Sequence, residues 1–561
     1  MPRSVTRVTP PRLVLASLAS AILLAACGGG SDAGGPAAPI QVSLAKIGQY
    51  QHLGGPSAAE ISAFDPRSDR LFVVNGALGS VDVLDLGNPA SPQLIDTLDA
   101  LDLGAGLGAA NSVAVYNGVV AVALQATVKT DPGSVVFLRA SDLAVLATVT
   151  VGALPDMLTF TPDGRALVVA NEGEPNSYNQ PDSVDPVGSV SIIRVTGLSP
   201  ATSSITTQVQ TAGFAAYDSQ LDSLRAAGVR IYGPNASVSQ DLEPEYLTIS
   251  TDSRTAWATL QENNAIAEID LASATVTRVR SLGSKDHNLA GAGMDVSDED
   301  GVSNSNSGTP AIRIAPVPVR GLYLPDAVAS YRVNGVNYLI TANEGDAREY
   351  VGINADGRED LRVRGYCGAL DPLVFGDAGN QILDSNLGRL RITAIPNGGL
   401  NSKNGSGQCN QLFSLGSRSF SIWNADSLVQ VYDSGDEFEQ RTTALPNVMF
   451  NASNDDNALD SRSASKGPEP EGVVLGTVRG RTLAFIGLER IGGIMVYDVT
   501  DPASPRFLSY ANPRIGATGD RGPEGLTFIS ATNSPTGLPL LVVGNETSGT
   551  TAVLQISASS L

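Results

Sequence analysis

Short runs in which apolar and polar residues alternate recur along the whole chain. Seven segments open with a turn and an acid or Asn and continue as an apolar run: "AEISAFDP" from 59, "NSVAVYNG" from 111, "PDMLTFTP" from 155, "PEYLTIST" from 244, "PDAVASYR" from 325, "PEGVVLGT" from 470 and "PEGLTFIS" from 523. A tight turn and a second apolar run, such as "ALVVAN" or "LLVVGN", follow. This alternation predicts β-strands, and the turns between the runs predict antiparallel pairing.

Seven such repeats, without sustained helical periodicity, predict an all-β fold: a seven-bladed β-propeller with long loop insertions. The last strand (550–557) and the first (40–50) are expected to share one blade, which would close the ring and remove free sheet edges. A pair of β-sandwiches is the alternative. The repeats are unevenly spaced, so loops or small subdomains are expected at 173–243, 281–324, 345–428 and 436–468, with a helical stretch at 217–228.

The first 40 residues differ from the rest. Basic residues precede "LVLASLASAILLAAC" (13–27), which is too short to span a bilayer comfortably. Its last four residues resemble the lipobox of bacterial lipoproteins, in which the Cys is acylated; an ordinary signal peptide is the alternative. We therefore expect a lipoprotein signal peptide at 1–27 with lipidation at Cys27, a flexible Gly/Ala/Pro linker at 28–40 and the propeller at 41–561. Gly28 is not a retention signal of the Asp type, which favours the outer membrane, with the periplasmic or cell-surface face left open.

Carboxylates recur where the apolar strands begin and end. In an antiparallel pair the start of the first strand lies beside the end of the second. Five repeats carry an acid at both places, 16 to 22 residues apart: Asp156 with Glu172, Glu245 with Glu262, Asp326 with Glu344, Glu471 with Glu489, and Glu524 with Glu546. The first two repeats lack this pair and have Glu60 with Gly76 and Asn111 with Gln125. If the first strands line a central channel, these ten carboxylates converge at its mouth.

Such a gathering of like charges needs compensation. Two unit charges ~4 Å apart repel by about 1 kcal/mol in water and by about 4 kcal/mol at an effective dielectric of 20. Oxygen ligands without His or Cys favour Ca²⁺, with Mg²⁺ or Mn²⁺ second. We therefore predict a divalent-cation site among the ten acids and Asp346, and we take Arg348 and Arg490 as candidates to steady a bound anion. Backbone N–H groups and basic side chains as the partners of these acids are the alternative.

The composition of the chain limits which classes of partner it can bind. Lys+Arg 36 against Asp+Glu 57 gives a net charge of −21, which repels phosphate backbones and excludes nucleic acid as a partner. Cys367 and Cys409 are expected to form a disulfide in an oxidising compartment, with two free thiols as the alternative. The acidic stretches 285–301 and 450–472 lack the spacing of an EF-hand loop and read as solvated loops or as further cation ligands.

Four segments together resemble the choice-of-anchor I domain: "ANEGDAREY" (342–350), "SRSFSIW" (417–423), "KDHNL" (285–289) and "FNASNDDNALDSRSASKGPEPEGV" (450–473). That family also includes the mesenchyme-specific cell surface glycoproteins of biomineralising animals, and the resemblance covers about 45–561. It implies a seven-bladed propeller in an extracellular or periplasmic place, held by anchors that differ between members. Some members carry the label alkaline-phosphatase-like, but this chain lacks the nucleophile site and the His-rich two-metal cluster of that superfamily.

Two functions of different classes remain. The favoured one is a lipid-anchored, extracytoplasmic binding or structural protein that holds Ca²⁺ and contacts a glycan, a mineral or a protein, because no nucleophile–base pair can be identified. It would touch the membrane only through its lipid. The alternative is a Ca²⁺-dependent phosphoesterase acting on a phosphorylated small molecule, in which the cation activates water and Arg348 or Arg490 steadies the charge.

Overall fold

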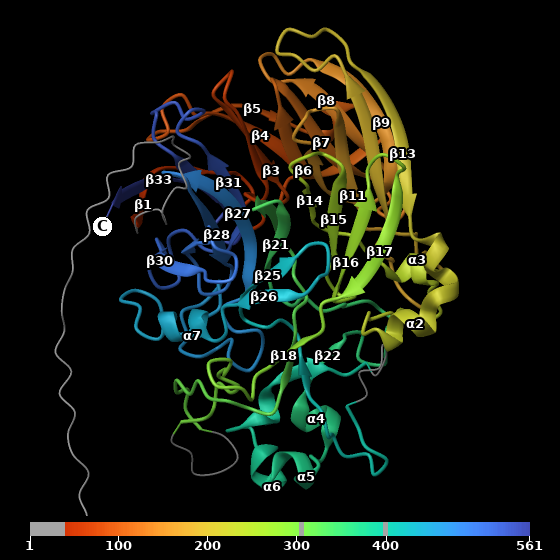
Figure 1. Ribbon diagram of the computed structural model, residues 1–561, viewed down its shortest axis with the longest axis vertical. Helices are drawn as coiled ribbons and strands as arrows, with labels where there is room; N and C mark the ends of the chain where they lie inside the picture. Colours follow the sequence, from red (N-terminus) through yellow and green to blue (C-terminus); the bar gives the residue numbers. More distant parts are fainter. Residues whose placement is uncertain (1–39, 302–307, 396–401, 561) are drawn as a thin grey trace, which may run out of the picture. The chain divides into compact units, whose positions relative to one another are not determined.

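The computed structural model describes residues 40–301, 308–395 and 402–560, which form an all-β protein (Figure 1). Its strands build seven four-stranded antiparallel sheets, numbered here 1 to 7 in chain order. The expected signal peptide, Cys27 and all but the last residue of the expected linker lie outside the described residues. Within the described part, no helix has the length and the apolar character needed to cross a membrane.

The seven sheets have the following strands. Sheets 1 and 2 contain β2 (Ser62–Asp65), β3 (Arg70–Asn75), β4 (Ser80–Asp85) and β5 (Gln93–Leu98), then β6 (Leu107–Tyr116), β7 (Val119–Ala126), β8 (Pro132–Arg139) and β9 (Val145–Ala153). Sheets 3 and 4 contain β10 (Pro155–Phe160), β11 (Ala166–Asn171), β12 (Ser189–Thr196) and β13 (Thr206–Gly213), then β14 (Leu247–Ile249), β15 (Thr255–Leu260), β16 (Ala265–Asp270) and β17 (Thr275–Ser281). Sheets 5 to 7 contain β20 (Val328–Val333), β21 (Val336–Ala342), β25 (Phe420–Asn424) and β26 (Gln430–Asp433), then β27 (Pro470–Val478), β28 (Arg481–Leu488), β29 (Ile494–Asp498) and β30 (Arg506–Ala511), and finally β31 (Pro523–Ile529), β32 (Leu540–Asn545), β33 (Thr550–Ser560) and β1 (Ile40–Gln51).

Consecutive sheets are neighbours in space. The first strands contact one another in the order β2, β6, β10, β14, β20, β27 and β31, and β31 in turn contacts β2. Seven clusters of buried apolar side chains each lie between two neighbouring sheets, including one between sheets 7 and 1. The hydrophobic core is therefore divided into layers between the sheets.

Burial across a sheet explains the sequence pattern. All six residues of β11 are buried because both faces of this inner strand are covered, so its sequence is continuously apolar. The outer strand β13 is largely exposed and correspondingly polar. Hairpins such as that between β6 and β7 close with Asn117 and Gly118, both at positive φ, the conformation that a two-residue turn requires.

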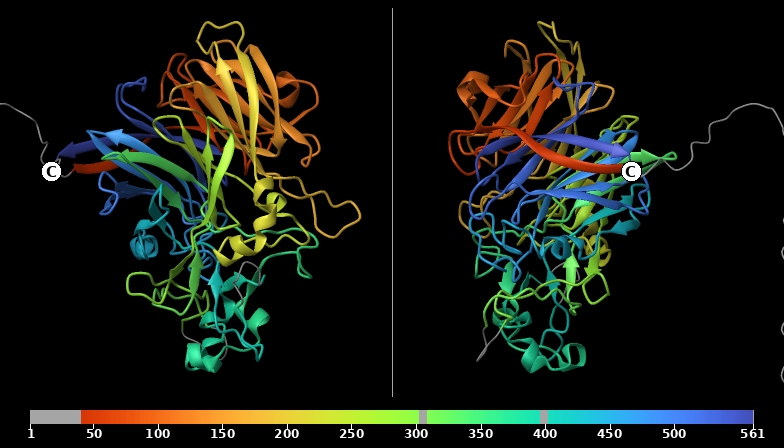
Figure 2. Two further views of the ribbon diagram at one scale, coloured as in Figure 1. Left: turned by 45° about the vertical axis from the view of Figure 1, so that its right-hand side comes forward. Right: turned by 90° about the vertical axis from the view of Figure 1, so that its left-hand side faces the viewer.

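The first and last strands of the described chain pair with each other, as the sequence predicts. β1 runs antiparallel to β33 from Ile40 opposite Ser560 to Gln51 opposite Thr550, and Figure 2 shows the two strands side by side. One sheet thus joins residues from both ends of the chain. This pairing gives β33 a partner on the side away from β32.

The expected loop regions hold more structure than the sequence suggests. The segment 173–243 contains β12 and β13, which complete sheet 3, as well as η1 (Ala215–Gln220), α2 (Leu221–Ala226) and α3 (Val238–Asp241). The helical stretch expected at 217–228 is confirmed by η1 and α2. In the segment 345–428, β25 forms the third strand of sheet 5. The sequence did not reveal these strands because long insertions separate β12 and β25 from their repeats, and because β13 is an exposed outer strand.

An insertion follows sheet 4 and interrupts sheet 5. It contains β18 (Ser284–Asp286), β19 (Arg320–Leu322) and β24 (Phe413–Ser414) in one small sheet, β22 (Asp360–Arg362) paired with β23 (Arg391–Thr393), and the short helices α4 (Val363–Cys367), α5 (Pro372–Phe375), α6 (Ala378–Gln381) and η2 (Leu387–Arg389). Figure 1 shows α4, α5 and α6 together, and a separate apolar cluster includes Cys367 and Cys409, which form a disulfide. The remaining helices are α1 (Ala100–Leu103) and α7 (Glu437–Thr442).

Candidate cation site in an acidic cavity

A cavity of about 210 Å³ receives side chains from all seven sheets. Each sheet contributes residues from its first strand or from the segment just before that strand. Four of the lining residues are acids: Glu60, Asp156, Asp326 and Glu524. Carboxylates that are distant in sequence therefore line one cavity, which we call the acidic cavity.

Strand register explains why the predicted pairs form. Pro155 pairs with Asn171, Pro470 with Leu488 and Pro523 with Asn545, and in each case the register shifts directly afterwards. The acid after each proline therefore lies in a bulge, opposite the acid that follows the second strand. Bulges re-aim side chains. The same local device thus places Asp156, Glu471 and Glu524 in three different sheets.

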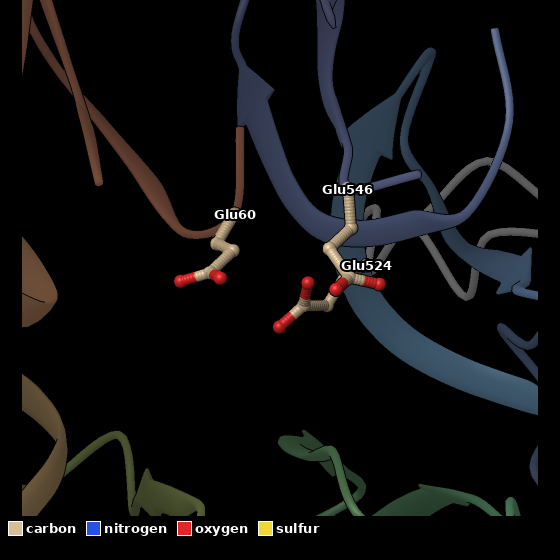
Figure 3. Close-up of side chains that lie close together, drawn as sticks. All are labelled: Glu60, Glu524 and Glu546. Atoms are coloured by element: carbon tan, nitrogen blue, oxygen red, sulfur yellow. The ribbon is translucent and has the colours of Figure 1, made fainter. Parts of the chain in front are cut away.

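Three acids from opposite ends of the chain form the Glu60 cluster: Glu60, Glu524 and Glu546. Each offers a carboxylate oxygen, and these oxygens all lie within 4.8 Å of one another (Figure 3). Burial, together with the charges of Glu546 and Asp156, raises the pKa of Glu60 to about 8. Burial and the charges of Glu60 and Glu546 raise the pKa of Glu524 well above its ordinary range. Among the described residues, no basic side chain lies within ion-pair distance of these three acids.

Gly76 makes room for the Glu60 side chain. A Cβ at Gly76 would lie 2.1 Å from Oε1 of Glu60, so the carboxyl group lies directly over this glycine. Gly76 follows β3 at the position where Glu172 follows β11 and Glu546 follows β32. Sheet 1 therefore has a glycine where these other sheets have an acid, and this glycine leaves room for Glu60, which lies just before β2.

A second group, the Glu471 cluster, contains Glu344, Glu471 and Glu489, again with oxygens within 4.8 Å of one another. Here basic side chains are present: Lys466 Nζ lies 3.0 Å from Glu344 Oε1, and Arg490 Nε lies 3.1 Å from Glu489 Oε2. Burial and the charges of Glu489 and Glu344 raise the pKa of Glu471 well above its ordinary range. Its Oε2 is buried and accepts no hydrogen bond from the described residues.

Glu469 holds the cations of the Glu471 cluster in place. Its fully buried carboxylate forms ion pairs with Arg462, with Lys466 at 3.2 Å and with Arg490 at 3.1 Å. Burial raises its pKa, but the positive charges of these three residues outweigh burial and hold the pKa far below its ordinary range. Glu469 is therefore ionised and belongs to an ion-pair network.

The acids of sheets 3 and 4 also interact in pairs. Glu245 and Glu262 are each 7% exposed. Burial, followed by the charge of Glu262, raises the pKa of Glu245 well above its ordinary range. Burial and the charge of Asp156 do the same for Glu172, and burial and the charge of Glu344 do the same for Asp326. All five predicted pairs are therefore electrostatically linked.

The two arginine candidates have different surroundings. Arg348 is buried and forms ion pairs with Asp241 at 2.7 Å and Glu243 at 2.8 Å, so it is not free to steady an anion. Its partners are acids from α3 and from the segment that follows it. Arg490 is partly exposed and borders a second cavity, together with Asp346, whose side chain is 59% exposed and contacts Lys466. Asp346 thus lies at a rim and not in either cluster.

The two acidic stretches outside the repeats meet in space. Asp295 and Asp300 of the first stretch and Asp460 of the second offer oxygens within 4.8 Å of one another. Burial raises the pKa of Asp295 to about 7 and, with the charge of Asp295, the pKa of Asp460 to about 8. Neither stretch is simply a solvated loop, because Asp295 and Asp460 are fully buried.

A family model of the choice-of-anchor I domain matches residues 60–502. The chain belongs to the choice-of-anchor I family. The match begins at Glu60 and ends between β29 and β30. The whole Glu471 cluster lies within it, whereas Glu524 and Glu546 of the Glu60 cluster lie beyond its end.

Two relatives of this choice-of-anchor I protein are similar over shorter stretches. Gigasin-3a of Magallana gigas is 30% identical over 168 residues, which are 27% of this chain and 59% of the relative. The mesenchyme-specific cell surface glycoprotein of Strongylocentrotus purpuratus is 28% identical over 103 residues, 16% of this chain and 13% of the relative. The chain therefore spans less than two thirds of either relative.

Two solved structures are distant matches to the choice-of-anchor I chain. A chain of the mitotic checkpoint complex is 9% identical with a TM-score of 0.44 over 95% of this chain and 98% of that one. A chain of Kuenenia stuttgartiensis hydrazine synthase is 13% identical with a TM-score of 0.41 over 89% and 96% of the two chains. These scores carry no argument about fold or function.

Sequence reasoning missed two residues of the site. Glu60 had no partner in its own repeat, so it was not among the predicted ligands. Glu469 lies in a polar segment whose place depends on the fold. The signal available for Glu60 was Gly76, because a residue without a side chain stands where other repeats carry an acid.

Proposed function

We propose that this choice-of-anchor I protein is a lipid-anchored surface protein whose acidic cavity binds a divalent cation, Ca²⁺ in the first place. The observation that carries the proposal is the Glu60 cluster, three carboxylates beside a cavity without a basic partner in the described part of the chain. Like charges at such distances repel, and burial strengthens the repulsion. Either protons or a cation must compensate them, and a divalent cation does so while leaving the acids ionised.

The donor set favours Ca²⁺. All three side chains of the cluster supply carboxylate oxygen, and Ser57 Oγ donates to Glu546 Oε1 at 2.8 Å, which leaves the other oxygens of the cluster available. Hard oxygen ligands from separate segments suit the flexible coordination of Ca²⁺, whereas Mg²⁺ demands near-ideal octahedral geometry. Mn²⁺ is the remaining candidate on the same chemistry.

The architecture that we propose is a closed seven-bladed propeller, in which each sheet is one blade. Support comes from the cyclic order of neighbouring first strands, from the seven apolar layers between sheets and from the pairing of β1 with β33. In this arrangement the acidic cavity lies where the blades meet. Closure would then be the reason that Glu60 reaches Glu524.

Attachment to the membrane through Cys27 is part of the same proposal. The sequence Leu24-Ala25-Ala26-Cys27 supports it, as does a relative whose printed name describes a cell surface glycoprotein. Cys27→Ser should abolish labelling by a radioactive or clickable fatty acid and release the protein from outer-membrane fractions. Labelling that persists in this variant would contradict acylation at Cys27.

Metal content and metal-dependent stability test the cation site directly. Protein purified without chelators should contain Ca²⁺, and millimolar Ca²⁺ should raise its melting temperature relative to EDTA, because a ligand that binds only the folded state stabilises it. Glu524→Gln should remove most of this shift, whereas Glu268→Gln on β16, outside the cavity, should retain it. Equal melting in EDTA and in Ca²⁺, Mg²⁺ and Mn²⁺ would overturn the proposal.

A second candidate function is a Ca²⁺-dependent phosphoesterase. Arg490 beside the Glu471 cluster favours it, because a cation and a guanidinium group would then face one substrate. Purified protein would hydrolyse p-nitrophenyl phosphate in Ca²⁺ and lose this activity in EDTA. No turnover between about pH 5 and pH 10 with any of the three metals would reject the enzyme and leave the surface-binding function.

A further inference from the structure

A second cavity, also of about 210 Å³, is lined by an unusual share of basic residues. Five of its eleven lining residues are basic: Arg358, Arg391, Arg462, Lys466 and Arg490. The chain as a whole has 36 Lys and Arg among 561 residues and a net charge of −21. So high a local share of positive charge on an acidic protein calls for an explanation, and we call this cavity the basic pocket.

Two inner carboxylates anchor these cations. Asp360, on β22, contacts Arg358 and, at 3.0 Å, Arg391 on the neighbouring β23. Glu469 does the same for Arg462, Lys466 and Arg490, as described above. Lys466 also pairs with Glu344, and Arg490 also pairs with Glu489. The lining itself holds five basic residues and three acids, of which Asp346 and Glu349 have side chains that are 59% and 57% exposed. Solvent weakens the field of these exposed acids.

The anchoring bonds occupy only part of each guanidinium group. Arg462 uses Nε and Nη2 on Glu469, and Arg391 uses Nη1 on Asp360. Arg490 uses Nε on Glu469 and Nη1 on Asn454, at 3.1 Å each. Within the described residues, Nη1 of Arg462, Nη2 of Arg391 and Nη2 of Arg490 donate to no protein acceptor. Their orientation is fixed by the anchored side of the group, and their N–H donors are free for a ligand.

We propose that the basic pocket binds a dianionic oxyanion, the chemistry that phosphate and sulfate groups share. Preoriented guanidinium groups form charge-assisted, often bidentate, hydrogen bonds with such oxygens. The five basic residues and three acids of the lining differ by two positive charges, which a dianion matches better than a monoanionic carboxylate does. This inference depends on the pocket alone and not on any catalytic step.

The pocket shares a wall with the Glu471 cluster. Lys466 contacts Glu344, and Arg490 contacts Glu489, so both basic residues belong to the pocket and to the cluster. A cation bound at this cluster would take over the pairing with Glu344 and Glu489, so Lys466 and Arg490 would be freer to contact an anion in the pocket. An anion bound in the pocket would in turn favour binding of the cation. This coupling is reciprocal. It rests on a cation at the Glu471 cluster, as in the second candidate function, whereas anion binding itself does not.

Calorimetric titration of the full chain with inorganic sulfate, in EDTA and at low ionic strength, tests the pocket. Saturable binding is expected; titration with inorganic phosphate shows which of the two anions the pocket prefers, and acetate, as a monoanion, should bind much more weakly. Arg391→Gln should weaken sulfate binding by about fivefold, because one set of charged donors is lost. Arg278→Gln on β17 changes the net charge equally but lies outside the pocket, so it should leave the affinity almost unchanged.

Asp346→Asn provides a test of the opposite sign. Removal of this exposed acid from the rim should tighten sulfate binding about twofold, because it repels the anion. Absence of saturable binding up to about 10 mM sulfate, or equal weakening by Arg391→Gln and Arg278→Gln, would overturn the pocket. A sulfate affinity that millimolar Ca²⁺ leaves unchanged would overturn only the coupling, and anion binding in EDTA would stand even if no cation bound the acidic cavity.

Discussion

The Glu60 cluster and the Glu471 cluster solve the same electrostatic problem in different ways. Each gathers three glutamates with oxygens within 4.8 Å of one another. Lys466 and Arg490 pair with acids of the Glu471 cluster, whereas the Glu60 cluster has no such partner among the described residues. The difference teaches that a ring of acids is not one site: where basic residues are built in, the acids are structural, and where they are absent, the acids are free for a ligand.

Replacing the built-in cation should convert one kind of cluster into the other. Lys466→Met removes the charge that pairs with Glu344 and Glu469 but retains much of the packing volume. Because two buried carboxylates lose their partner, we expect a loss of about 3 kcal/mol in the free energy of unfolding in EDTA, measured by urea denaturation. Ca²⁺ should restore much of this loss, because the cluster then resembles the Glu60 cluster. A variant as stable as the wild type in EDTA would show that Lys466 does not compensate these acids.

Removing one acid from each cluster should affect cation binding unequally. Glu546→Gln is expected to weaken Ca²⁺ binding by about tenfold or more, since affinity depends on the number of charged ligands. Glu489→Gln should have a much smaller effect, because Arg490 and Asn454 already contact this carboxyl group. Calorimetric titration with Ca²⁺ measures both. Equal losses in the two variants would mean that the clusters are equivalent.

The pH dependence of stability distinguishes protons from cations as the compensating charge. Burial, with the charges of Glu546 and Asp156, raises the pKa of Glu60 from its ordinary 4.5 to about 8. Between these two pH values the folded state retains a proton that the unfolded state has lost, so folding is favoured below pH 4.5 and this stability is lost as pH rises to about 8.

We therefore expect the melting temperature in EDTA to fall from pH 5 to pH 8 and to fall less steeply in Glu60→Gln, whose side chain does not titrate. Saturating Ca²⁺ should flatten the profile, because the bound acids are ionised throughout. Thermal denaturation across this range measures the effect. A melting temperature that rises with pH in EDTA would contradict the raised pKa values.

The smallest expected effect concerns the space beside Glu60. Gly76→Ala places a methyl group where Oε1 of Glu60 lies, and the flexible end of this side chain can move aside without disturbing the fold. Ca²⁺ affinity should fall about twofold to threefold while the melting temperature in EDTA changes little. Gly213→Ala, at the end of β13, is a matched control because a Cβ there meets no atom within 4 Å. Unchanged affinity in Gly76→Ala would place Glu60 outside the site.

Local pattern was sufficient to predict the acid pairs and most inner strands. Asp156 and Glu172 are 16 residues apart, and the antiparallel register that joins them follows from one turn. The strands β12, β13 and β25 were not predicted, because long polar segments separate β12 and β25 from their repeats and the exposed outer strand β13 lacks a continuous apolar signal. The disulfide could be predicted from a single pair of cysteines, since no competing partner follows the signal region.

The sequence by itself determined which residues alternate, where the turns fall and which two acids each hairpin brings together, because these depend on neighbours within about 20 residues of chain. Only the tertiary structure decided which pairs join. Glu60 meets Glu524 because sheet 7 lies against sheet 1, and Lys466 reaches Glu344 across 122 residues of sequence. Arg348 cannot contact an anion, because it is already paired with Asp241 and Glu243. The energy of a charge depends on the groups around it in space, and the packing of the sheets and the insertion determines which groups these are.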